Sequence, residues 1–100
     1  MYQQGFYKQI DEARIIEEVR REGFDPLPIT DPPSHRYPPH RHPEIKLLVF
    51  LAGEMEVTVG AKSYQCSAGD RLVIQGNVEH SATVGPEGCV FLWSEKMDEP

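Results

Sequence analysis

The distribution of apolar residues changes twice along the chain and divides it into three zones. In the first zone, apolar residues recur at every third position among charged ones, at Ile10, Ala13, Ile16 and Val19. This spacing is typical of an amphipathic helix. Acidic residues at its start, arginines at its end and Gly23 just beyond them predict a helix over residues 11–22. The simplest role for this helix is to cover an apolar face of the domain, and recruitment of a partner protein is the alternative.

The second zone, residues 26–43, holds seven prolines. Proline lacks an amide donor and fixes φ, so neither a helix nor a central strand is expected there. Ile29, Tyr37 and three histidines lie in this zone or next to it. We therefore expect an extended segment that is pinned to the domain and forms at most short edge pairing.

From Glu44 onward, apolar and polar residues alternate with a period of two, as in strands. The alternating apolar positions include Met55, Val57 and Val59, and later Cys89, Phe91 and Trp93. Glycines fall at short intervals between these runs, at Gly53, Gly60, Gly69, Gly76, Gly85 and Gly88. This rhythm predicts a small antiparallel sandwich or barrel.

The stretch from Ile45 to Ala52 differs from the other strands because every position except Lys46 is apolar. Such a strand is covered on both faces. The cover is either the opposite sheet together with the N-terminal helix, or a second subunit. Because a small barrel has few elements of its own to supply cover, we expect a homodimer.

The length of 100 residues fits one domain and is short for two. We divide it into an N-terminal helix and proline-rich lead-in, residues 1–33, and a barrel, residues 34–100. The predicted fold class is all-β, with one N-terminal amphipathic α-helix.

The net charge of −6 repels phosphate backbones, so nucleic acid is not expected as a partner. No uninterrupted apolar run reaches 18 residues, and the first residues do not have the basic-then-apolar order of a signal peptide. We therefore expect no membrane span. Cys66 and Cys89 lie within apolar-alternating stretches and are interpreted as free thiols of a cytoplasmic protein.

Histidines supply the candidate chemistry. His40 and His42 are two residues apart, so in an extended chain both imidazoles project from one face. His80 follows the turn-prone pair Gly76-Asn77 at the start of a later strand, and an antiparallel return can place it beside them. His35 is interpreted as a solvated loop residue.

Two segments resemble the conserved motifs of the cupins. The stretch from His40 to Gly53, with its paired histidines and closing glycine, is similar to the first cupin motif, and Gly69 to His80 is similar to the second. The resemblance covers about residues 34–93. It implies a double-stranded β-helix, a conical barrel of two antiparallel sheets with a pocket at one mouth, also described as a jelly roll.

The resemblance also implies a metal site. Metal-bearing cupins hold a divalent ion between two histidines and a glutamate of the first motif and a histidine of the second, and His40, His42 and His80 match the histidines. Lys46 stands in the glutamate position. Other departures from the motifs are Ser34, Gln75, Asn77 and Val84. Three imidazoles still suffice to bind Fe(II), Zn(II), Ni(II), Cu(II) or Mn(II) with open positions for water and substrate.

Lys46 conflicts with such a site, since an ammonium 4 Å from one positive charge costs roughly 4 kcal/mol at an effective dielectric constant of about 20. The Lys46 side chain must therefore point away from the metal, lose its proton or pair with an anion. Glu44 is a candidate partner or substitute ligand, and a carboxylate substrate that bridges metal and Lys46 also resolves the conflict. Lys46 and Glu44 are the catalytic candidates, and the pocket candidates are Tyr37, Phe50, Gln75 and Trp93.

Two functions remain open from the sequence. The first is a metal-dependent enzyme that acts on a small, anionic substrate, for which the resemblance implies dioxygenase, isomerase or decarboxylase chemistry. The second is a metal-free pocket that binds a small ligand as a sensor, without catalysis. A structural or storage role is the least attractive, because the chain is small.

Overall fold

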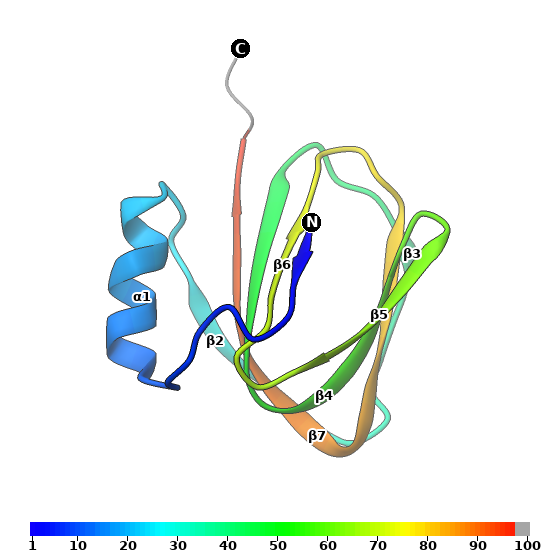
Figure 1. Cartoon of the computed structure of the whole chain (residues 1–100). Helices are drawn as coiled ribbons and strands as arrows, with labels where there is room; N and C mark the ends of the chain where they lie inside the picture. The colour runs from blue at the N-terminus through cyan, green and yellow to red at the C-terminus, as the bar shows by residue number, and fades with distance from the viewer. Residues whose placement is uncertain (98–100) are drawn as a thin grey trace.

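Two long bent strands organise the fold. The computed structural model describes residues 1–97, which form one helix and seven strands. The elements in chain order are β1 (Tyr2–Gln3), α1 (Glu12–Arg21), β2 (Leu27–Asp31), β3 (Arg36–His40), β4 (Ile45–Val59), β5 (Lys62–Ser67), β6 (Arg71–Ile74) and β7 (His80–Lys96). The strands β4 and β7 pair with each other over almost their whole length. Their curvature wraps the sheet into the open barrel seen in Figure 1.

The shorter strands extend the two halves of this central pair, and all pairings are antiparallel. β6 pairs with the first half of β4, and β5 with the second half. β3 pairs with the first half of β7, and β2 with the second half. Within residues 1–97, each of the two strands from the proline zone thus pairs only with β7, which agrees with the predicted edge pairing. β2 ends at Asp31, and the domain boundary after residue 33 stays a prediction.

Gly53 marks the bend in β4. The register of β4 on β7 shifts on both sides of it, between Phe50 and Ala52 and between Gly53 and Met55. The φ of Gly53 is +74°, and a Cβ there would collide with the carbonyl oxygen of Gly88 on β7. A side chain is therefore excluded at this crossing. The interpretation of Gly53, Gly85 and Gly88 as breaks between strands is wrong, because all three lie inside long strands.

The bulge also changes which β4 residues face the barrel interior. Before it, Leu48 and Phe50 pack inside, and after it Met55 and Val57 do. An extra residue at a bulge shifts the alternation by one position, so the inward set passes from even to odd numbers. The interior cluster also contains the free thiols Cys66 and Cys89, Leu72, Ile74, Val84 and Phe91.

The helix α1 covers the outer face of the first half of β4. Leu47, Val49 and Leu51 form a second buried cluster with Ile15 and Val19 of the helix. The predicted cover of the Ile45–Ala52 stretch by helix and opposite sheet is thus present within one chain. This removes the argument from which a homodimer was expected, and the homodimer stays an untested prediction.

The ends of α1 agree closely with the sequence prediction. Asp11 caps the helix by accepting a hydrogen bond from the Arg14 backbone N–H, and Gly23 has a φ of +92° just past the C-cap Glu22. Arg71 of β6 makes two hydrogen bonds, each 2.5–2.6 Å long, with the Glu22 carboxylate and so fastens the helix end to the barrel. No helix within residues 1–97 is long and apolar enough to cross a bilayer.

Candidate metal centre

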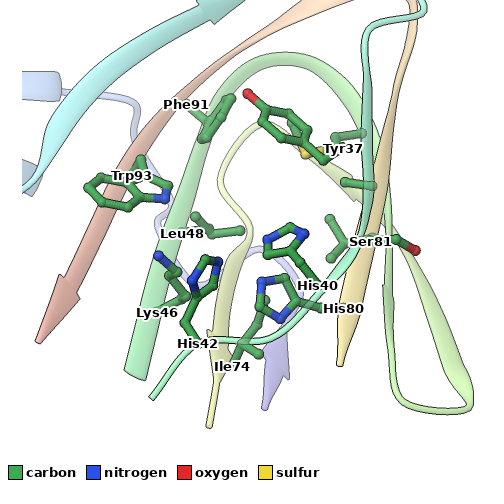
Figure 2. A pocket seen from close by; sticks show the side chains of 13 residues that line it. Tyr37, His40, His42, Lys46, Leu48, Ile74, His80, Ser81, Phe91 and Trp93 are labelled. Carbon is green, nitrogen blue, oxygen red and sulfur yellow. The ribbon is translucent and has the colours of Figure 1, made fainter. Parts of the chain in front are cut away.

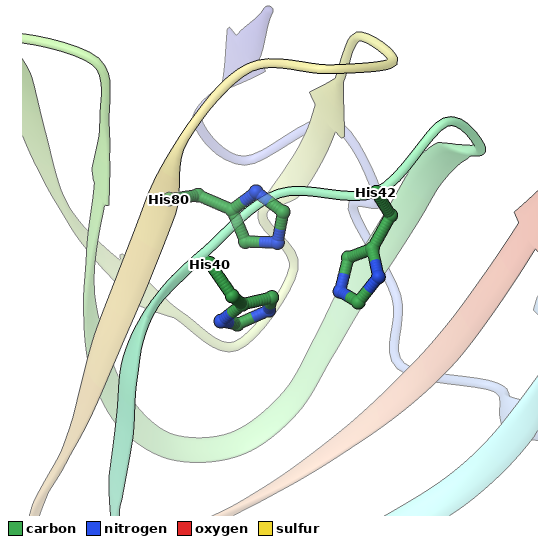
Figure 3. Close-up of side chains that lie close together, drawn as sticks. All are labelled: His40, His42 and His80. Atoms are coloured by element: carbon green, nitrogen blue, oxygen red, sulfur yellow. The ribbon is translucent and has the colours of Figure 1, made fainter.

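The strand pairing of β3 with β7 brings three histidines together. His40 at the end of β3 is the direct partner of His80 at the start of β7, and His42 lies two residues further on, before β4. The ring centroids lie 4.3 Å apart for His40 and His80, 4.6 Å for His40 and His42, and 5.5 Å for His42 and His80. One ligand nitrogen from each ring lies within 4.8 Å of the others. Figure 3 shows the three rings gathered from two neighbouring segments.

Two backbone carbonyls orient the rings. Nδ1 of His40 lies 2.6 Å from the carbonyl oxygen of Pro38, and Nδ1 of His80 lies 2.9 Å from that of Val78. A carbonyl oxygen only accepts, so each Nδ1 carries a proton, and in the neutral ring each Nε2 keeps its lone pair. This is the tautomer that binds a metal through Nε2, with the outer nitrogen held by a hydrogen bond. The donor set therefore fits a divalent transition metal ion.

The electrostatics of His80 also favour metal binding. Burial lowers the pKa of His80, and its electrostatic interactions with His40, His42 and Lys46 lower it further, whereas the hydrogen bond to the Val78 carbonyl opposes these effects. An imidazole must be neutral to bind a metal. The surroundings of His80 thus favour the form that acts as a ligand.

The histidines stand in the wall of a pocket with a volume of about 270 Å³. This is near the small end of the range for small-molecule sites. Most of the wall is apolar, as Figure 2 shows. The lining residues that are not histidines are Tyr37, Lys46, Leu48, Met55, Val57, Ile74, Ser81, Ala82, Phe91 and Trp93.

Lys46 is buried at the edge of this pocket, and its ammonium forms an ion pair with a carboxylate of the chain. It is 5% exposed, and its Nζ donates a hydrogen bond of 2.5 Å to Oε2 of Glu95. The same ammonium lies 4.4 Å from the centre of the Trp93 ring, a cation–π contact. The pair follows from the sheet register, in which Lys46 is the direct partner of Glu95. The proposed partner Glu44 is thus replaced by Glu95, and Glu44 does not line the pocket.

Tyr37 forms a second polar element of the wall. Its hydroxyl donates a hydrogen bond of 2.5 Å to Oδ2 of the buried Asp31. Burial, together with this hydrogen bond and the charge of Asp31, raises the pKa of Tyr37. The phenol therefore keeps its proton, and the proton lies on a short path to a carboxylate.

The structure separates the sequence-predicted pocket residues into two groups. Tyr37 and Trp93 line the pocket, whereas Phe50 is fully buried in the barrel core and Gln75 is exposed. His35 lies outside the metal cluster and packs its ring against Tyr37 at 4.8 Å. Sequence reasoning missed Glu95 and Asp31. The available signal for Glu95 was its position two residues after Trp93, on the same side of a strand.

Comparison with known proteins agrees with this fold and site. Residues 29–95 match the family model described as the Cupin domain. The match spans two thirds of the chain, and the chain belongs to the cupin family. The predicted double-stranded β-helix, inferred from the two motifs, is therefore confirmed.

Among curated proteins, the chain is similar to dimethylsulfoniopropionate lyase DddW of Ruegeria pomeroyi, with 36% identity over 61 residues. The alignment covers 61% of this chain and 40% of that relative, so the chain spans less than half of the relative's length.

Solved structures share the fold at low sequence identity. The cupin domain of Cnp3 from Schizosaccharomyces pombe has a TM-score of 0.69 and 19% identity, over 75% of this chain and 56% of that chain. The dimethylsulfoniopropionate lyase DddQ from Ruegeria pomeroyi has a TM-score of 0.68 and 22% identity, over 75% of this chain and 39% of that chain. At these identities the likeness establishes the fold alone.

Proposed function

We propose that this protein is a metal-dependent cupin enzyme that acts on a small molecule held in the pocket of the barrel. The observation that carries the proposal is the convergence of His40, His42 and His80 in the wall of an apolar pocket, each with a ligand nitrogen within 4.8 Å of the others. Three protein ligands leave positions open for substrate, as in catalytic metal sites.

A divalent ion of Fe, Mn, Ni, Zn or Cu at this site would supply Lewis-acid chemistry to a substrate oxygen. The residues of the chain supply the surroundings. Leu48, Ile74 and Phe91 exclude bulk water from the pocket, which strengthens electrostatic interactions inside it. Tyr37 and Asp31 hold a proton in the wall through their hydrogen bond.

For the reaction, we place lyase chemistry first, beside the dioxygenase, isomerase and decarboxylase chemistry expected of cupins. The relative DddW, named as a lyase, supports this order. An elimination needs a group that takes a proton from the substrate. In the pair of Tyr37 and Asp31, the carboxylate of Asp31 is the base and Tyr37 is the relay: the Tyr37 oxygen takes the substrate proton as its own proton moves to Asp31, so the phenol is protonated before and after the step.

A second candidate function is ligand binding without catalysis. Two observations favour it. The ion pair with Glu95 holds the positive charge of Lys46 next to the site. The candidate ligands among the described residues are three histidines without a carboxylate. In that case the protein would bind its ligand as a sensor, and the histidines would form part of a metal-free pocket.

Metal titration tests the proposal. Apoprotein is titrated with Zn(II) and Fe(II) by calorimetry, and the bound metal is counted by elemental analysis. We expect one ion per chain in the wild type and loss of most of it in His42→Ala and His80→Ala. His35→Ala is the matched control, since it removes an imidazole outside the cluster. Equal metal content in all four proteins would contradict the site, and a metal-free wild type would favour the sensor.

Activity is then tested on the metal-loaded protein with a panel of small carboxylic acids that includes dimethylsulfoniopropionate. Elimination from that compound removes a proton next to the carboxylate and breaks a C–S bond, giving acrylate and dimethyl sulfide. Turnover of any member that depends on added metal and is lost in His80→Ala supports an enzyme. Binding without turnover throughout the panel favours the sensor.

A further inference from the structure

The charges in the pocket wall are unbalanced. The described lining residues include one ammonium, that of Lys46, and three imidazoles, but no carboxylate. Glu95 offsets Lys46, yet its side chain is 33% exposed and points its charge partly to solvent. A divalent ion on the histidines adds two further positive charges. An anion from solution is the missing counter-charge.

Lys46 is placed to share such an anion with the histidines. Its ammonium has three donor hydrogens, and the Glu95 carboxylate takes up one direction. Figure 2 shows the Lys46 amine and the His42 ring extending toward the same part of the pocket. The remaining space is bounded by apolar side chains such as Leu48, Ile74 and Phe91.

We infer, on the basis of the proposed function, that the pocket takes a small monocarboxylate. Its carboxylate lies between Lys46 and the three histidines, and its body lies against the apolar wall. One lysine without an arginine suits a carboxylate better than a phosphate dianion.

Metal and carboxylate therefore bind cooperatively. The metal lowers the cost of placing the anion beside a wall that is otherwise apolar, and the anion lowers the repulsion between the metal and Lys46. Such coupling is reciprocal, so each ligand must raise the affinity for the other by the same factor.

The test compares three probes of similar shape on zinc-loaded protein: 4-methylpentanoate, the neutral 4-methylpentanamide, and the cation trimethyl(3-methylbutyl)ammonium. Binding is measured by calorimetry and by the fluorescence of Trp93, the single tryptophan of the chain, which lines the pocket. We expect the carboxylate to bind at least tenfold more tightly than the amide and the cation not to bind. The carboxylate should also raise zinc affinity by the factor by which zinc raises carboxylate affinity.

Variants assign the preference to Lys46. Lys46→Met should remove most of the preference for carboxylate over amide while zinc is still bound, and Lys46→Arg should retain it. Lys62→Met, at an exposed lysine of β5, is the matched control and should behave as the wild type. If Lys46→Met fails to fold, Lys46→Arg is compared with the wild type instead. Loss of the preference for carboxylate over amide in Lys46→Arg would contradict a role for the charge alone.

Three results would overturn the inference: equal binding of carboxylate and amide, an unchanged preference in a folded Lys46→Met protein, or tighter binding of inorganic phosphate than of carboxylate. If zinc binds but any of these is found, the inference fails and the proposed function stands. If zinc does not bind to the wild type, the proposed function fails and the inference with it.

Discussion

At the scale of single residues, the pair of Lys46 and Glu95 decides how strongly the site can hold a metal. A buried ammonium near the three histidines opposes a bound cation, and Glu95 offsets this only in part because it lies partly in solvent. Removing one member of a buried ion pair leaves the other charge without its partner, and this costs more than the pair itself contributes. A change that places a carboxylate at residue 46 is therefore combined with a neutral residue at position 95.

The double variant Lys46→Glu with Glu95→Gln should bind metal more tightly than the wild type. The first change removes the like charge and adds a carboxylate ligand, and the second avoids placing two carboxylates in contact. We expect a rise in zinc affinity on the order of tenfold or more, about 1.4 kcal/mol for each decade. Competition with a chromogenic zinc chelator measures it. An affinity equal to or below that of the wild type would show that residue 46 does not face the metal.

The residues of the site were predictable to different degrees. The three histidines follow from the motif spacing, and the conflict raised by Lys46 follows from its charge. The partner Glu95 lies 49 residues from Lys46 in sequence, and their contact depends on the register of β4 against β7. Residue types alone do not fix that register. Phe50 was assigned to the pocket, but the inward face at this end of β4 is filled by the core.

At the scale of elements, the helix α1 depends on a few buried residues. Ile15 is 2% exposed and packs against the outer face of β4, whereas Ile10, just before the helix, is 46% exposed. The spacing of apolar residues in the sequence assigns Ile10 to the buried face of the helix and places Ile15 beside that face. The face of α1 that packs on β4 is therefore rotated about the helix axis relative to the predicted face.

Ile15→Ala should lower the free energy of unfolding by about 2–4 kcal/mol, because it leaves a cavity between helix and sheet. Ile10→Ala makes the same chemical change at an exposed position and should cost less than about 1 kcal/mol. Urea denaturation followed by circular dichroism measures both. Equal effects of the two substitutions would contradict the packing of α1 on β4.

The first residues of the chain are held by Asp70, which is buried at the turn before β6. Its carboxylate accepts hydrogen bonds from the Tyr2 hydroxyl at 2.6 Å and from the backbone N–H groups of Gly5 and Ser67 at 2.8 and 2.9 Å. Burial alone would raise the pKa of Asp70, but these hydrogen bonds together hold it below its usual value of 3.8.

Stability should therefore depend on pH through Asp70. The contribution is fully present above about pH 4, where the carboxylate is charged in folded and unfolded chains, and is lost as the pH falls through the lowered folded value. Asp70→Asn should reduce stability at pH 7 and flatten its decline below pH 4. Urea unfolding at a series of pH values measures this, and a decline as steep as in the wild type would assign the acid sensitivity to other groups.

The helix and the strands were largely predictable because the spacing of apolar residues differs between a helix and a strand. The helix ends follow from capping residues, and the strand zones follow from alternation. The continuity of β4 and β7 could not be predicted, since a glycine in a bulge and a glycine in a turn look alike in sequence. At Gly53 the close approach of the Gly88 carbonyl decides between them.

At the scale of the whole molecule, the site links metal binding to folding. His40 and His42 are two residues apart in sequence, but His80 at the start of β7 joins them only in the folded barrel. A ligand that binds the folded state alone stabilises it by about 2.7 kcal/mol when free ligand is at 100 times its dissociation constant.

Zinc at that excess should therefore raise the thermal midpoint of the wild type by several degrees, given the small size of the domain. Little or no rise is expected for His80→Ala, and His35→Ala should follow the wild type. Scanning calorimetry with and without zinc measures the shifts. A similar rise in His80→Ala would place the bound zinc elsewhere.

The central claim is that three imidazoles of one chain bind a single metal ion. X-ray absorption spectroscopy of the protein loaded with one equivalent of zinc tests it most directly, because it counts the ligands and identifies them. We predict a first shell with three imidazole nitrogens at about 2.0–2.1 Å, completed by oxygen. A first shell with one imidazole or none, or with sulfur, would contradict the account.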